Sequence, residues 1–122
     1  MTIRSFRDLR TWQEAHKLCI KTYQVTSDFP QVERFGLISQ MRRASVSVGS
    51  NIAEGMGRQS TKERIRFFIF SRGSIQELLS QLELAKDLNF LDTSHYAQLT
   101  SRYEGLAAGI NIHIKRISAS KT

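Results

Sequence analysis

Two long segments of the sequence carry mostly apolar side chains at alternating intervals of three and four residues, and this spacing constrains the fold more than any other feature. Residues at these intervals share one face of an α-helix, whereas a β-strand alternates at every second residue. The sequence therefore predicts long helices over 60–88 and 93–117. The positions are Arg64, Phe68, Ser71, Ile75, Leu78, Leu82 and Ala85 in the first segment and Tyr96, Leu99, Tyr103, Leu106, Ile110, His113 and Ile117 in the second.

Two further helices are predicted in the first half of the chain, over 8–28 and 36–54. The first ends before Pro30, the only proline, because the residue before a proline disfavours the helical conformation. The second ends at the glycines on either side of Met56. Four helices joined by short loops predict an all-α fold, an antiparallel up-down-up-down four-helix bundle that forms a single domain over residues 1–122. The inner face of the first helix is expected to contain Trp12, Ala15, Cys19, Tyr23 and Thr26.

The composition favours an acidic partner and a reducing compartment. Eighteen Lys and Arg against eleven Asp and Glu give a net charge of +7, which is typical of proteins that bind nucleic acid. The single cysteine, Cys19, cannot form an internal disulfide, so we expect a cytoplasmic protein. No apolar run reaches the roughly 18 residues of a membrane span, and we expect no membrane partner.

Apolar residues outside the inner faces predict a homo-oligomer. Phe67 and Phe70 belong to a run of four apolar residues that covers most of the helix circumference, and Leu18 and Ile20 fall outside the inner face of the first helix. A contiguous exposed patch of such residues favours association, so we expect these four at contacts between copies. The alternative is a wide inner face with scattered exposed apolar residues, which are common on monomers.

The sequence contains no recognisable reaction centre. The segment from Gly55 to Ser60 lacks the ending of a nucleotide P-loop and follows no strand, and the three histidines lack metal-ligand spacing. We therefore expect no catalytic residues, no cofactor and no metal, and interpret the protein as a non-enzyme. Asn51, Glu54 and Gly55 are expected to be structural residues of the turn after the second helix, with Glu54 paired to a nearby arginine.

A basic surface is the strongest candidate binding site. Arg58, Lys62 and Arg66 recur every four residues, and Arg42 and Arg43 are contributed by the preceding helix, which we expect to end at the same loop. Such stripes bind phosphates without reading bases, which favours RNA or DNA bound without sequence specificity. Two alternatives stay open. The stripe is equally typical of a solvated helix face, and it also suits a scaffold or accessory subunit whose partner is an acidic protein.

Several short motifs resemble one known family. They are Phe6-Arg7-Asp8-Leu9 with Trp12, Phe29-Pro30, Phe35-Gly36-Leu37, Gln40-Met41-Arg42-Arg43-Ala44, Asn51-Ile52-Ala53-Glu54-Gly55, and Gly73-Ser74 with Glu77-Leu78 and Gln81-Leu82. Together they resemble the four-helix-bundle family of 23S rRNA intervening-sequence proteins.

The resemblance implies a bacterial, cytosolic bundle that assembles as a homo-pentamer and has no established enzymatic activity. A similar bundle serves diversity-generating retroelements as an accessory protein that binds the reverse transcriptase and nucleic acid through a positively charged surface. By that likeness Arg42, Arg43, Arg58, Lys62 and Arg66 become the residues to test.

Overall fold

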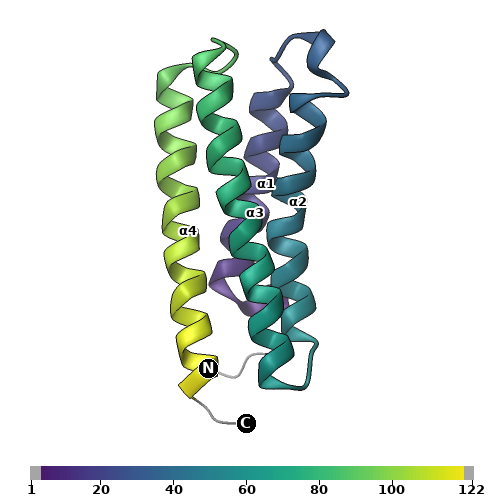
Figure 1. The fold of residues 1–122 in the computed structure, drawn as a ribbon, viewed down its shortest axis with the longest axis vertical. Helices are drawn as coiled ribbons and strands as arrows, with labels where there is room; N and C mark the ends of the chain where they lie inside the picture. Colours follow the sequence, from purple (N-terminus) through teal and green to yellow (C-terminus); the bar gives the residue numbers. More distant parts are fainter. Residues whose placement is uncertain (1–3, 120–122) are drawn as a thin grey trace.

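The computed structural model describes residues 4–119 and consists of four long helices (Figure 1). The elements are the short helix η1 (Phe6–Asp8), α1 (Arg10–Thr26), the short helix η2 (Gln31–Glu33), α2 (Leu37–Met56), α3 (Thr61–Asp87) and α4 (Thr93–Ala119). The connections alternate between the two ends of the bundle, so consecutive helices run in opposite directions (Figure 1). The predicted all-α four-helix fold is confirmed, and each long helix ends within two residues of its predicted bounds. Residues 1–3 and 120–122 of the predicted domain lie outside the described residues.

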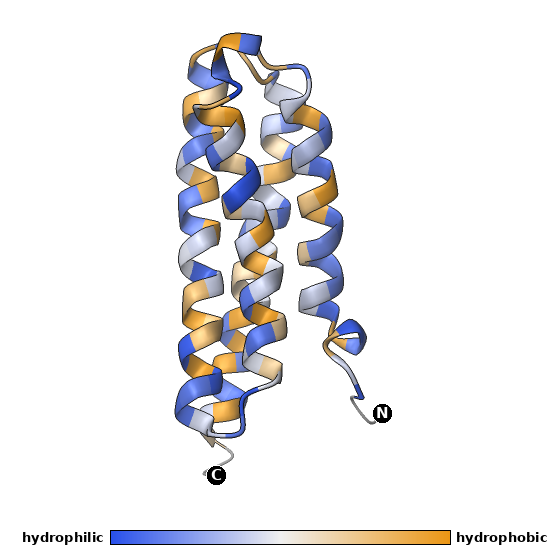
Figure 2. Ribbon diagram, turned by 90° about the vertical axis from the view of Figure 1, so that its right-hand side faces the viewer, coloured by the Kyte–Doolittle hydropathy of each residue, from blue (hydrophilic) through white to orange (hydrophobic). Residues whose placement is uncertain are grey.

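Each helix is amphipathic, so polar and apolar residues alternate along the ribbons (Figure 2). The buried residues of all four helices form one core, and its largest fully buried side chains include Tyr103, Phe68, Leu18 and Met41. α1 packs on α2 and α4, and α3 packs on the same two helices, so α1 and α3 lie diagonally across the bundle. No helix within residues 4–119 is both long and apolar enough to cross a membrane.

The buried face of α1 includes two threonines whose hydroxyls are hydrogen-bonded. The hydroxyls of Thr22 and Thr26 donate to the carbonyls of Leu18 and Thr22, both at 2.8 Å, so neither brings an unpaired polar group into the core. The phenol of Tyr103 also lies 2.8 Å from the Thr22 hydroxyl, which ties α1 to α4. The inner face therefore differs from the predicted one, and Tyr23, expected inside, is 41% exposed.

This difference corrects one predicted interface residue. Leu18 is 0% exposed within the single chain and is surrounded by core residues, so it is not available to a second copy. The prediction that Leu18 lies at an oligomer contact is wrong. Ile20, two residues further on, is 49% exposed, and its predicted role stays a prediction.

Gly55 allows α2 and α3 to approach closely where they converge. A Cβ at this buried position would lie 3.2 Å from the Phe67 Cβ and 3.4 Å from the Arg64 carbonyl oxygen, and both atoms are fixed by the α3 backbone. Further along the pair, the Ser71 hydroxyl donates to the Val48 carbonyl at 2.7 Å. Gly55 is therefore a packing residue of α2 and not only the end of a helix.

Replacing Gly55 with alanine is expected to destabilise the bundle by about 1 kcal/mol, because overpacking of about 1–3 kcal/mol exceeds the gain in helix propensity. The matched control is Gly73→Ala on α3, where no atom lies within 4 Å of the new methyl group. This control is expected to stabilise by about 0.5–1 kcal/mol. Urea unfolding followed by circular dichroism measures both, and equal effects would show that the α2–α3 contact tolerates the extra carbon.

The turn between α3 and α4 is built from two residues whose types suit their positions. Asn89 has a φ of 62°, a left-handed conformation that asparagine adopts more readily than most residues. Asp92 then caps α4, because its carboxylate accepts from the His95 amide at 2.7 Å. The same contacts lower the pKa of Asp92, with the His95 amide as the largest cause. The turn therefore sets α4 antiparallel to α3 within a few residues.

Candidate nucleic-acid interface

The turn between α2 and α3 positions three of the predicted cations, Arg58, Lys62 and Arg66. Ser60 caps α3 by accepting from the Glu63 amide at 3.1 Å, so the helix begins directly after the turn. Lys62 and Arg66, four residues apart on α3, are both exposed. No carboxylate within residues 4–119 lies within 4.0 Å of either cation. These two side chains can therefore approach a phosphate without first breaking an ion pair.

Arg58 is held by its neighbours. Its guanidinium lies 3.3 Å from a Glu54 carboxylate oxygen and 3.8 Å from one of Glu63, and it stacks over the Phe67 ring at 4.8 Å. The Arg58 carbonyl also accepts from the Arg64 side chain at 2.7 Å. Two carboxylates beside one guanidinium leave little net positive charge at this point. Arg58 therefore stabilises the turn, and Lys62 and Arg66 are the more available cations.

The three residues predicted for the turn belong to the last turns of α2. Glu54 pairs with Arg58, as expected. Asn51 donates to the Ser47 carbonyl and to the Ser47 hydroxyl, both at 2.9 Å, so it binds within α2 and not at the turn. Gly55 lies against α3. The structure thus gives all three of them structural contacts.

Two aromatic side chains of the predicted oligomer contact lie close to cations of this region. Phe67 and Phe70 meet edge to face, with ring centroids 5.7 Å apart. Phe70 is 45% exposed, and the Arg66 guanidinium lies over its ring at 5.4 Å. The proposed phosphate-binding residues and the proposed contact residues are therefore adjacent on α3.

Arg42 and Arg43 lie far from the turn. Thirteen residues separate Arg43 from Met56 at the end of α2, which corresponds to about 20 Å along the helix axis. The expectation that all five cations gather at one loop is wrong, because both arginines belong to the first half of α2. The structure therefore forms two basic regions at opposite ends of this helix.

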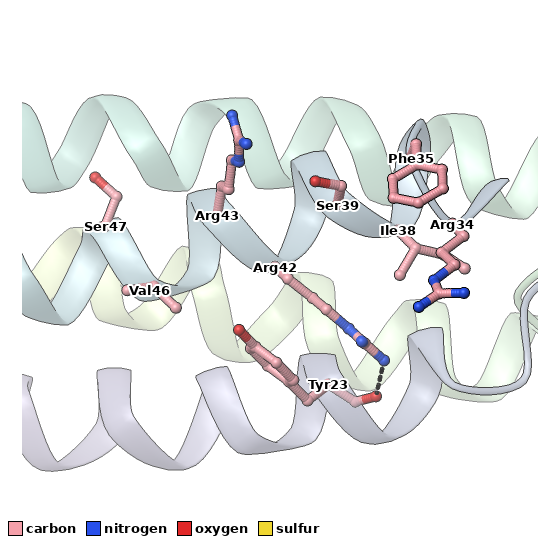
Figure 3. Close-up of a pocket in the computed structure, with 9 residues that line it drawn as sticks. All are labelled: Tyr23, Arg34, Phe35, Ile38, Ser39, Arg42, Arg43, Val46 and Ser47. Carbon is pink, nitrogen blue, oxygen red and sulfur yellow. Dashed lines mark hydrogen bonds between the residues drawn. The ribbon is translucent and has the colours of Figure 1, made fainter.

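Arg42 is a bridge between α2 and the end of α1. Its guanidinium donates to the Thr26 hydroxyl at 3.0 Å and to the Ser27 hydroxyl at 3.2 Å. It also donates to the Tyr23 carbonyl at 3.2 Å (Figure 3). It also stacks over the Tyr23 ring at 4.7 Å. A cation at the C-terminal end of a helix is favoured by the unpaired carbonyls there. The side chain of Arg43 points away from α1, on the side of α2 opposite to Arg42, and is exposed (Figure 3).

We expect Arg42→Ala to lower the free energy of unfolding by about 1–3 kcal/mol, the range for hydrogen bonds to charged groups. Arg43→Ala, one residue away, is the control and should change stability by less than about 0.5 kcal/mol, because the side chain is exposed. Chemical denaturation of the two variants at one protein concentration measures the difference. Equal losses would contradict a bridging role for Arg42.

A cavity of about 540 Å³ opens on the outer side of α2 beside Arg42 (Figure 3). We call it the tip cavity, and its lining includes Tyr23, Arg34, Phe35, Arg42, Arg43 and Val46. The sequence interpretation missed Arg34 and Phe35, which lie in the loop before α2. The sequence did contain a signal for them, because Arg34 and Phe35 place a cation next to an aromatic residue shortly after Pro30.

His113 has the surroundings of a structural residue. Its ring stacks on Phe68 with centroids 5.1 Å apart, and burial followed by the charge of Arg116 lowers its pKa. In the part of the chain that the structure describes, no group of three or more His, Cys, Asp or Glu side chains could hold a metal ion. His113 therefore contributes to packing between α3 and α4.

Comparisons with known proteins identify the family. A crystal structure of a protein of unknown function, from the S23 ribosomal protein family of Bacteroides thetaiotaomicron, matches with a TM-score of 0.78 and 18% sequence identity, over 86% of this chain and 98% of that chain. At 18% sequence identity, the similarity between the two structures shows a shared fold and nothing about function. No curated protein matches. A family model described as 23S rRNA-intervening sequence protein matches residues 7–112, most of the length. The chain therefore belongs to the family of 23S rRNA-intervening sequence proteins.

Proposed function

We propose that this protein is a non-enzymatic homo-oligomer that binds the phosphate backbone of RNA or DNA without sequence specificity. The observation that carries the proposal is the pair Lys62 and Arg66, exposed on one face of α3 with no carboxylate of residues 4–119 within 4.0 Å. Arg43 adds a further exposed cation on α2. A net charge of +7 attracts a polyanion to any of these positions.

RNA is the first nucleic acid to test. The family description refers to 23S rRNA, and the structural neighbour is assigned to a ribosomal protein family. Long cationic side chains on a helix face contact phosphates and carry no information about bases. Binding should therefore depend steeply on salt and little on sequence. A cytoplasmic location is part of the proposal.

Self-association is supported by apolar side chains that the single chain leaves uncovered. Ile20, Ile69, Phe70 and Ile112 are each between 42% and 51% exposed. Burying such side chains between copies would remove apolar surface from water. The pentamer implied by the family resemblance is the expected assembly, and repetition of the basic face in each copy would add avidity.

The test is the mass of the assembly by light scattering, with and without a 20-base-pair RNA duplex, at about 50 and 200 mM salt. We expect an oligomer that takes up RNA at low salt and releases it as the salt rises, because counterion release drives phosphate contacts. An oligomer that ignores RNA and DNA at both salt concentrations would overturn nucleic-acid binding. Saturable binding to an acidic protein in that case would support the scaffold hypothesis.

A further inference from the structure

The tip cavity has the charge of an anion site. Three arginines line it, Arg34, Arg42 and Arg43, and no Asp or Glu of the described residues does so. The neighbouring acidic residue, Glu33, is occupied elsewhere, because its carboxylate accepts from the Leu37 amide at 3.1 Å and so caps α2. Within residues 4–119, no carboxylate forms an ion pair with the three arginines of the cavity.

The cavity also presents an aromatic ring to solvent. Phe35 is 89% exposed, although the Arg34 guanidinium lies 5.4 Å from its ring centre. The opposite wall is Tyr23, whose ring is fixed by the Arg42 guanidinium stacked on it. In Figure 3, Tyr23 extends from α1 toward α2, whereas Phe35, Ile38 and Val46 are carried by α2 and the loop before it, and all four line the cavity. An exposed phenyl ring beside guanidinium groups is a surface for stacking and cation–π contacts.

We propose that the tip cavity binds one unpaired nucleotide of a nucleic acid, with its base stacked on Phe35 and the adjacent phosphates contacted by Arg34 and Arg43. This deepens the proposed function and rests on it. The volume of about 540 Å³ lies within the range of about 300–1,000 Å³ for small-ligand sites. Stacking on aromatic rings with cations along the backbone is the usual mode of single-strand recognition.

The proposal separates single strands from duplexes. In a duplex the faces of the bases are covered by their neighbours, so only the phosphates can reach the tip cavity. An unpaired nucleotide offers both a ring face and a phosphate. The protein should therefore bind single-stranded RNA by phosphate contacts together with stacking, and duplex RNA by phosphate contacts alone.

The test compares Phe35→Leu with the wild-type protein on a 12-nucleotide uridine strand and on a blunt-ended RNA duplex that has the same number of phosphates and no unpaired nucleotide. Leucine keeps the apolar volume but removes the aromatic face, and the exposure of Phe35 makes a loss of folding unexpected. Binding of the single strand should weaken about 5- to 150-fold, the range for one lost stacking contact. Binding of the duplex should not change. Val32→Ala is the control, since this residue is 86% exposed near Phe35 in sequence and does not line the cavity.

A second readout locates the nucleotide. Irradiation of the complex with a strand containing 4-thiouridine should crosslink it to a peptide that includes Phe35 or Tyr23, and Phe35→Leu should reduce the yield. Arg34→Ala and Arg43→Ala should each reduce the salt dependence of single-strand binding by about one phosphate contact.

Three results would overturn the proposal and would also show which proposal has failed. If the wild-type protein binds neither RNA, phosphate binding itself fails. If it binds both RNAs and Phe35→Leu changes neither, or weakens both equally, only the nucleotide site fails. If Phe35 is needed instead for binding an acidic peptide that contains tryptophan, while the uridine strand does not bind, the cavity is a protein-docking site.

Discussion

Leu18→Ala is expected to lower the free energy of unfolding by about 2–5 kcal/mol, the largest stability effect among the substitutions considered. Leu18 is fully buried beside α4, and its carbonyl accepts from Thr22 and from the Tyr103 phenol, at 2.8 and 3.3 Å. Removing the side chain would leave a cavity at a site whose backbone is fixed by these bonds, so little collapse is expected. Urea unfolding of the protein at fixed concentration measures the loss.

The matched control is Ile20→Ala on the same helix, where the side chain is 49% exposed. In an isolated bundle this substitution should cost less than about 0.5 kcal/mol. A cost that grows with protein concentration would place Ile20 at a contact between copies, because assembly contributes to apparent stability by mass action. Equal, concentration-independent losses from both substitutions would contradict the burial pattern of α1.

Reversing the charge of both Lys62 and Arg66 to glutamate should weaken binding to duplex RNA about 100-fold or more at about 0.1 M salt. Each phosphate contact contributes close to one power of the salt concentration, so the loss of two contacts alone accounts for most of this factor. The two new carboxylates then repel the backbone. Arg58 is left unchanged, since its contacts with Glu54 and Glu63 stabilise the turn.

The control is Lys17→Glu with Lys21→Glu on α1, which is diagonally opposite α3. It has the same four-residue spacing and the same change in net charge. Fluorescence anisotropy across a salt series measures the binding of both double variants. The slope of log K against log salt concentration should become less steep by about two for the α3 variant, because two phosphate contacts are lost. Equal weakening by the two variants would mean that RNA binding depends only on the net charge of the protein.

The helices were predictable because their signals are local. Alternating spacing of three and four residues, Pro30, the Ser60 cap and the left-handed Asn89 all act within a few residues, and they set the observed ends. The inner face of α1 was predicted less well. Thr26 was expected inside and is buried, but Thr22 was not expected there, although its hydroxyl bonds to the preceding turn in the same way. A hydrophobic pattern does not reveal which threonines are paired in this way.

The site was predictable only in part, because its geometry depends on contacts between distant residues. The sequence placed Lys62 and Arg66 on one helix face, as the α3 register requires. It did not reveal that Arg42 bonds to residues 15 to 19 positions earlier, at the end of α1. It also did not reveal that Phe35 lies outside the core, because a phenylalanine next to a glycine is as typical of a buried loop residue as of an exposed one.

The guanidinium of Arg66 lies above the Phe70 ring, so the proposed self-association and the proposed RNA binding would share one contact. An assembly that buries this ring must either move the guanidinium to its edge or enclose it, and both change how strongly the cation attracts a phosphate. Thermodynamic reciprocity then requires a bound polyanion to change the association constant of the copies by the same factor. RNA would therefore regulate the number of copies in the particle, and the protein concentration would in turn set the apparent affinity for RNA.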